Sequence, residues 1–235
     1  MKNENKKKLT IYDGKAIEFT ANGQKMRIEF STDEFIESPR EDGRSNVAQF
    51  ICWHRRHYLG DAHEFADMYD LLESLYTEQG LEEEYKKYSI CDELIAGLED
   101  CFYIQKLYIY DHSGIIITKE RIDRWDSGFL GFAIISKDDA IKELGSSEET
   151  WRAAAEQCID NELEEYNTFL SGEVYSYSLY KLNICYACGY EHEELIDSCC
   201  GFYGDDFFNN GMVEYVGEDI AEAIYKAENG SEVNA

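Results

Sequence analysis

The first 60 residues alternate between hydrophobic and polar positions with a period of two, which is typical of half-buried β-strands. Residues 15–30 (KAIEFTANGQKMRIEF) place hydrophobic side chains at every second position on both sides of Asn22 and Gly23. Asn-Gly is a strong signal for a two-residue hairpin turn. The pattern therefore predicts a β-hairpin, which a polar loop connects to a buried strand within 47–54.

Helical spacing of the hydrophobic residues begins further along the chain. Asp61 with Glu64 three residues later imitates a capping box, so we expect a helix from Asp61 to Gly80. A short helix after Ser136 has Asp139 at its third position. The same reasoning predicts a short helix over 91–100, a long one over about 148–170 and a terminal one over 217–227.

The remaining hydrophobic runs predict strands over 102–118, 129–136, 173–184 and 192–204. Mixed, mostly adjacent strands with helices between them indicate an α+β fold: a mainly antiparallel sheet with a long acidic helix and several shorter helices packed on it. We expect a flexible basic N-terminus (1–8), one domain over 9–228 with a subdivision near residue 100 left open, and a disordered tail (229–235).

Charge is the most unusual property of the sequence. It contains 49 acidic and 22 basic residues, a net charge of −27, and the acids concentrate in 61–100, 138–173 and 191–235. A hydrophobic content of 44% argues against disorder. Such a chain should repel nucleic acid and anionic membranes and attract basic surfaces. With neither an export signal nor a membrane-spanning run, we expect a cytoplasmic protein with reduced thiols.

The long predicted helix carries a track of carboxylates on one face. Positions four apart rise about 6 Å along a helix, comparable with the spacing of successive phosphates on a nucleic-acid strand. An acidic face of this kind can occupy the lysine and arginine track of a nucleic-acid-binding protein; the alternative is a merely solvated helix face. The candidate partner-binding residues are Glu149, Glu156, Asp160 and Glu164 on this helix, together with Glu82, Glu83 and Glu84.

A different kind of site is suggested by two turn-like strings, YDHSG (110–114) and WDSG (125–128). They could bring Asp111, His112 and Asp126 together at one end of a sheet as an acid–base or nucleotide-binding site. The alternative is a pair of hairpin turns in which polar side chains bond their own backbone and Trp125 packs.

Four of the eight cysteines lie in 184–204 (ICYACGYEHEELIDSCCGFYG). Cys185 and Cys188 have zinc-knuckle spacing, and the further ligands would come from His192, from Cys199 or Cys200, or from His63. If a hairpin turns near Gly189, however, Cys199 lies opposite about Tyr180, too far from Cys188 for one metal. Free thiols at a hairpin tip, a zinc-dependent interaction module and a redox pair therefore stay open.

Five strings are similar to a family of acidic, uncharacterised proteins carried by phages and conjugative elements of Gram-positive bacteria. They are VAQFICWHRRHYLGD, LYIYDHSGIII, RWDSGFLGFAIISKDDA, NTFLSGEVYSYSLYKL and IDSCCGFYGDD. Cys200 replaces a tryptophan of this family's pattern. The resemblance spans about residues 9–225 and implies an accessory protein of a mobile element, and such genes often encode inhibitors of restriction or CRISPR defence.

These observations together predict a non-enzymatic inhibitor. It would bind the nucleic-acid-binding surface of a host defence nuclease as a DNA or RNA mimic, in the cytoplasm of a bacterial cell. We expect no catalytic residue, no metal and no cofactor, and a basic protein partner in place of nucleic acid or membrane.

Overall fold

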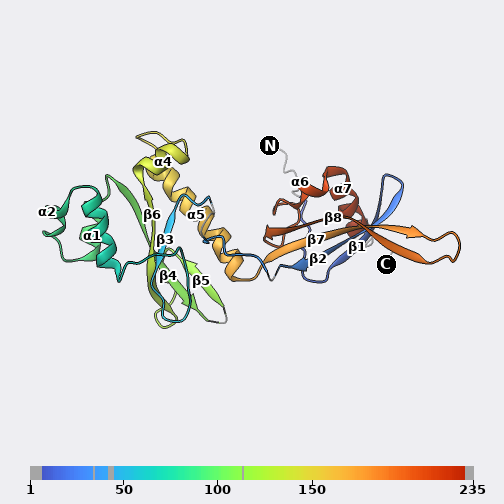
Figure 1. The fold of residues 1–235 in the computed structure, drawn as a ribbon, viewed down its shortest axis with the longest axis horizontal. Coiled ribbons are helices and arrows are strands. Elements are labelled where there is room, and N and C mark those ends of the chain that lie inside the picture. The colour runs from blue at the N-terminus through green and yellow to red at the C-terminus, as the bar shows by residue number, and fades with distance from the viewer. Residues whose placement is uncertain (1–6, 34, 42–44, 113, 231–235) are drawn as a thin grey trace. The chain divides into compact units, whose positions relative to one another are not determined.

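The computed structural model describes residues 7–33, 35–41, 45–112 and 114–230, and the chain divides into two compact units. Unit 1 combines residues 1–36 with 172–235, and unit 2 comprises 37–171. Each unit has its own four-stranded antiparallel sheet with helices packed on it, so the fold is α+β as predicted (Figure 1). Residues 1–6 and 231–235 of the two predicted flexible ends lie outside the described residues.

The two units divide the chain differently from the expected single domain with a subdivision near residue 100. The chain leaves unit 1 after β2 (Gln24–Thr32) and returns to it in β7 (Val174–Ile184). These two strands are antiparallel neighbours that pair Thr32 with Tyr175. In the sequence, unit 2 is therefore inserted between two paired strands of unit 1. Local hydrophobic patterns do not reveal such an insertion.

Unit 1 confirms the predicted N-terminal hairpin. β1 (Ala16–Ala21) pairs with β2, and Asn22 and Gly23 between them have φ values of 51° and 74°, the left-handed backbone that a tight two-residue turn requires. The strand order is β1-β2-β7-β8, with β8 at Glu191–Tyr203. The hydrophobic face of this sheet packs against α6 (Met212–Val216) and α7 (Glu218–Gly230).

Unit 2 is a sheet covered by helices on both faces (Figure 1). The strand order is β3-β6-β4-β5. Its strands are β3 (Gln49–Cys52), β4 (Phe102–Asp111), β5 (Ile115–Thr118) and β6 (Ser127–Ser136). Its helices are α1 (Met68–Glu78), α2 (Glu82–Tyr85), α3 (Cys91–Gly97), α4 (Lys137–Glu143) and α5 (Trp151–Leu170).

The two faces of this sheet form separate hydrophobic cores. On one face Trp151, Ala155 and Ile159 of α5 are buried against side chains of β3, β4 and β6. On the other face Leu72 of α1 and Leu94 of α3 are buried against the opposite side chains of the same strands. Burial of each such side chain contributes about 1.5–3 kcal/mol to folding. The helices therefore turn their polar residues, most of them acidic, outward.

Two predicted helix starts are wrong by several residues. α1 begins at Met68, because the carboxylate of Asp67 accepts hydrogen bonds from the N–H groups of Tyr69 and Asp70. α5 begins at Trp151 after Thr150, so the candidate Glu149 lies in the preceding turn and not on the helix. The local sequence did not distinguish Asp67, which caps α1, from Asp61, which has another role.

Asn167 of α5 covers the outer edge of β5. Its side-chain amide donates to the backbone oxygen of Ile117 (2.8 Å), and its oxygen accepts from the N–H of the same residue (2.8 Å). Both backbone groups are thereby satisfied at an otherwise open sheet edge.

We expect Asn167→Ala to lower the free energy of unfolding by about 1–2 kcal/mol in urea titrations. Thr168→Ala, which removes only a bond to the helix backbone, is the control and should cost less than about 0.5 kcal/mol.

Candidate functional site

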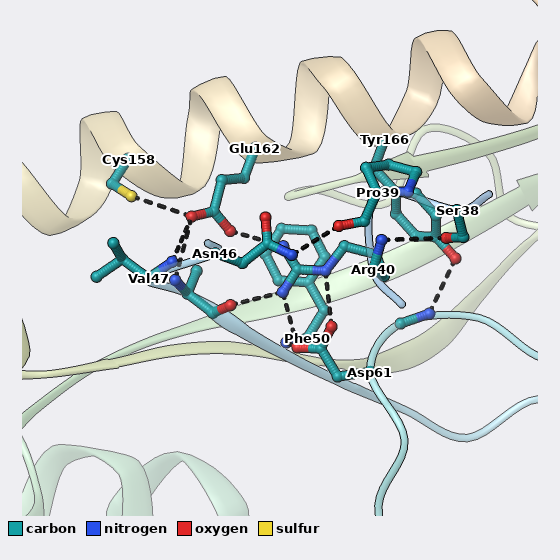
Figure 2. Close-up of polar contacts among 12 residues, drawn as sticks. Ser38, Pro39, Arg40, Asn46, Val47, Phe50, Asp61, Cys158, Glu162 and Tyr166 are labelled. Atoms are coloured by element: carbon teal, nitrogen blue, oxygen red, sulfur yellow. Dashed lines mark hydrogen bonds and ion pairs between the residues drawn. The ribbon is translucent and has the colours of Figure 1, made fainter. Parts of the chain in front are cut away.

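The most elaborate polar cluster of unit 2 centres on Arg40, whose side chain is only 1% exposed (Figure 2). Its Nε and Nη2 donate to the two carboxylate oxygens of Asp61 at 2.8 and 2.7 Å. Its Nη1 donates to Glu162 of α5 at 2.6 Å, and Nη2 also donates to the backbone oxygen of Ala48. The guanidinium lies over the ring of Phe50, 4.0 Å from its centroid.

The two carboxylates of this cluster also hold backbone groups. Asp61 accepts the N–H of Phe50 at 2.7 Å, and Glu162 accepts the N–H groups of Val47 and Ala48 at 2.8 and 3.2 Å (Figure 2). Asp61, predicted as a helix cap, is therefore the partner of Arg40 instead. The cluster joins the segment before β3, β3 itself, the segment after it and α5, so its role is to hold unit 2 together.

A cavity of about 1020 Å³ opens beside this cluster, within the size range of small-molecule sites. Arg40 in its wall is already neutralised by two carboxylates and offers no free charge to a ligand. The cavity is lined by Ser38, Arg40, Glu41, Cys52, Trp53, His54, Arg55, His57, Tyr58, Leu59, Gly60, Asp61, Ala62, His63 and Tyr166.

Three histidines line this cavity, a grouping that sequence reasoning missed. The rings of His54 and His57 stack with centroids 5.1 Å apart, and burial, with smaller contributions from His57 and Arg56, lowers the pKa of His54. His63 Nε2 lies 3.0 Å from the backbone oxygen of Cys52. The Nδ1 atoms of His54 and His63 are buried without a hydrogen-bond partner in the described part of the chain. The one sign of this grouping in the sequence is that the three histidines lie within ten residues of one another.

The outer surface of α1, α2 and α3 is the most acidic region that folds as one layer. Residues 67–100 contain 11 acidic residues and two lysines. The lysines pair locally, Lys86 with Glu83 and Lys87 with Glu84, while Lys106 of β4 pairs with Asp92. Within the described ranges no salt bridge reaches the other exposed carboxylates of this layer, which are Asp67, Asp70, Glu73, Glu78, Glu82, Glu93, Glu99 and Asp100.

The predicted acidic track on α5 is different in character. Lys119 contacts Asp160 at 2.5 Å and Glu156 at 3.8 Å, so one cation lies beside two of the four candidate carboxylates. Glu149 bonds the hydroxyl of Ser147 in the turn before the helix. Glu164 is exposed on the helix surface. Only three of the four candidate carboxylates therefore lie on α5, and Lys119 reduces the negative charge of two of them.

The residues of the alternative acid–base site do meet at one end of the unit 2 sheet. The N–H of Asp111 donates to the backbone oxygen of Asp126 (3.2 Å), and His112 Nδ1 lies 3.7 Å from the Asp126 carboxylate. Asp111 itself is paired with Arg56 at 2.6 Å. All of these side chains are solvent-accessible and none lines the cavity, and Trp125 is 86% exposed, so the expectation that it packs is wrong. Ser113 lies outside the described residues.

The cysteine-rich stretch forms the β7–β8 hairpin, as one of the sequence alternatives proposed. Cys185 and Cys188 lie in its tip, while Cys199 pairs with Tyr177 far down the hairpin. The predicted partner, Tyr180, is wrong because the turn is centred between Ala187 and Cys188 and not near Gly189. No group of three or more His, Cys, Asp or Glu among the described residues is arranged to hold a metal ion. The hairpin register separates Cys199 from the two cysteines of the tip.

Comparison with protein-family models, with curated protein sequences and with solved structures gave no match. Among the helices in the described ranges, none combines the length and apolarity needed to cross a membrane.

Proposed function

We propose that this protein is an acidic inhibitor, encoded by a phage or conjugative element, that binds the nucleic-acid-binding surface of a bacterial defence nuclease of restriction or CRISPR type. It acts as a DNA or RNA mimic, with carboxylates in place of phosphates. The observation that carries the proposal is the outer surface of the α1–α3 layer, where eight exposed carboxylates form no salt bridge within the described residues.

The α1–α3 layer fits this role better than the α5 track. Mutual repulsion among unpaired carboxylates opposes folding, and the layer tolerates it because Leu72, Tyr76 and Leu94 anchor the helices from below. A basic groove that displaces counterions from phosphates would relieve this repulsion on binding. On α5, Lys119 already provides part of that compensation. We therefore place the main contact surface on α1–α3. Of the candidates Glu82, Glu83 and Glu84, only Glu82 has no salt bridge there, because Glu83 and Glu84 pair with Lys86 and Lys87.

Competition binding tests the proposal. Purified protein is titrated against restriction endonucleases and CRISPR nucleases in the presence of labelled DNA or guide RNA over a salt series. We expect displacement of the nucleic acid from at least one class of nuclease, with affinity that falls steeply as salt increases. Affinity that is constant from low to high salt would rule out charge mimicry.

Two charge-matched variants test the surface. The α1–α3 variant removes four charges by replacing Glu73, Glu78, Glu82 and Glu93 with glutamine. The α5 variant also removes four charges, by replacing Glu149, Glu156 and Glu164 with glutamine and Asp160 with asparagine. We expect the first to weaken binding about 100-fold and the second less than about 5-fold, at contributions near 0.7 kcal/mol per charge. Equal losses would show that total charge matters and that the assigned surface is wrong.

A further inference from the structure

The end of the β7–β8 hairpin extends beyond the rest of its sheet (Figure 1). β2 accompanies β7 only as far as the pair Met26–Lys181. The last three pairs of the hairpin, Leu182 to Glu193 through Ile184 to Glu191, have only each other as strand neighbours in the described chain. The tip between them therefore faces solvent, and Tyr186 within it is fully exposed.

The tip closes in one helical turn that places two cysteines together. The N–H of Gly189 donates to the backbone oxygen of Cys185 (2.8 Å), and the N–H of Cys185 donates to that of Tyr190 (2.8 Å). Gly189, with φ of +71°, ends the turn. Side chains three positions apart in such a turn lie about 5–6 Å apart at Cβ, on one side of the backbone. A disulfide bond needs Cβ atoms about 3.5–4.5 Å apart, so the exposed turn must tighten by about 1–2 Å for Cys185 and Cys188 to be joined.

The two sulfur atoms already interact. The thiol of Cys188 donates a hydrogen bond to the sulfur of Cys185, and the backbone N–H groups of Cys188 and Ala187 point to the same sulfur. These three donors stabilise the thiolate and lower the pKa of Cys185. The cysteine in the more exposed position, Cys188, remains free to act as the second thiol.

Other cysteines of the chain are in less reactive surroundings. Burial raises the pKa of Cys52 and of Cys158 to about 12. Burial, with a smaller contribution from Asp33, also raises the pKa of Cys200, which lies beside Cys199 on β8. Cys199 and Cys200 thus form a second cysteine pair on the same hairpin, but they are adjacent residues of a β-strand and not part of a turn. This pair serves as an internal control for the reactivity of Cys185 and Cys188.

We propose that Cys185 and Cys188 form a redox-active dithiol that exchanges with low-molecular-weight disulfides of the glutathione class. In the first step the Cys185 thiolate attacks one sulfur of the disulfide, forming a mixed disulfide and releasing one thiol. In the second step the Cys188 thiol loses its proton and attacks the Cys185 sulfur, forming the Cys185–Cys188 bond and releasing the second thiol. Two protein thiols are oxidised and one small disulfide is reduced. This activity does not depend on the proposed inhibition of nucleases.

The test uses the full-length protein in reduced and oxidised glutathione buffers, followed by acid quenching, alkylation and mass spectrometry. Cleavage after Glu191, Glu193 or Glu194 separates the tip cysteines from Cys199 and Cys200. We expect a Cys185–Cys188 disulfide in the wild type and an accumulated glutathione adduct on Cys185 in Cys188→Ser. Alkylation of Cys185 at pH 7 should be at least about 10-fold faster than that of Cys200.

The control variants are Cys185→Ser, which should lose the rapid reaction, and the double replacement Cys199→Ser with Cys200→Ser, which should retain it. Because the tip is exposed, circular dichroism should be the same for all of these variants. The proposal is overturned if the tip cysteines stay reduced across the glutathione buffers. It is also overturned if Cys188→Ser collects no adduct, or if Cys200 reacts as fast as Cys185.

Discussion

Replacing Arg40 with methionine is expected to lower the free energy of unfolding of unit 2 by about 3–5 kcal/mol. The substitution leaves the carboxylates of Asp61 and Glu162 without their cation in a largely buried position. It also removes the bond to the backbone oxygen of Ala48 and the contact with the ring of Phe50. Several segments of unit 2 lose their common anchor at once.

Tryptophan fluorescence in urea measures this effect selectively, because Trp53, Trp125 and Trp151, the three tryptophans of the chain, all belong to unit 2. Arg56→Met is the matched control: Arg56 is 71% exposed and also pairs with an aspartate, so the cost should be under about 1 kcal/mol. Equal effects of the two variants would contradict the structural role assigned to Arg40.

A combined variant distinguishes the loss of the bonds made by Arg40 from the cost of leaving two buried carboxylates without a cation. Adding Asp61→Asn and Glu162→Gln to Arg40→Met removes the unpaired carboxylates, so part of the lost stability should return. No recovery would indicate that packing and the backbone bonds of Arg40, more than its charge, stabilise unit 2.

Gly131→Ala is expected to destabilise unit 2 by about 3 kcal/mol. A β-carbon at Gly131 would lie 2.0 Å from the backbone oxygen of Ile51 and 2.8 Å from the Cα of Cys52. Both atoms belong to the backbone of β3, which pairs with β6 at this point, so neither can move without breaking the ladder. The substitution forces the edge strand β3 away from β6 at the end of their ladder.

Gly128→Ala in the same strand provides the control for Gly131→Ala. The nearest atom to a β-carbon there is Ile109 Cγ2 at 4.0 Å, an ordinary contact. Both substitutions reduce the freedom of the unfolded chain in the same way, so their difference in urea midpoint reports the clash. Similar midpoints would show that β3 can shift to accept the methyl group.

Local signals in the sequence predicted much of the fold. Asn22-Gly23 predicted the turn of the first hairpin, and Ser136 with Asp139 predicted the start of α4, where the Ser136 hydroxyl oxygen accepts the N–H of Asp139 at 3.0 Å. In each case the residues that determine the geometry are adjacent or three apart. Propensity and side-chain capping act at that range, so a pattern in one sequence is enough to detect them.

Contacts between distant residues could not be predicted in this way. Arg40 and Glu162 are 122 positions apart, and nothing near either residue marks the other as its partner. The role of Asp61 followed from that contact, which is why a plausible capping pattern misplaced the start of a helix. On α5, the helical spacing correctly put Glu156, Asp160 and Glu164 on one helix, but only the fold shows that Lys119 lies beside Glu156 and Asp160.

The insertion of unit 2 between β2 and β7 has a consequence for biosynthesis. The strand that should lie beside β2 leaves the ribosome only after 135 or more further residues have followed the first hairpin. At usual elongation rates this delay is on the order of 10 s, during which the hydrophobic side of β1 and β2, including Phe19 and Phe30, has no cover. Unit 2 is contiguous and can fold during this interval, so we expect the nascent hairpin to be the chain's most chaperone-dependent segment.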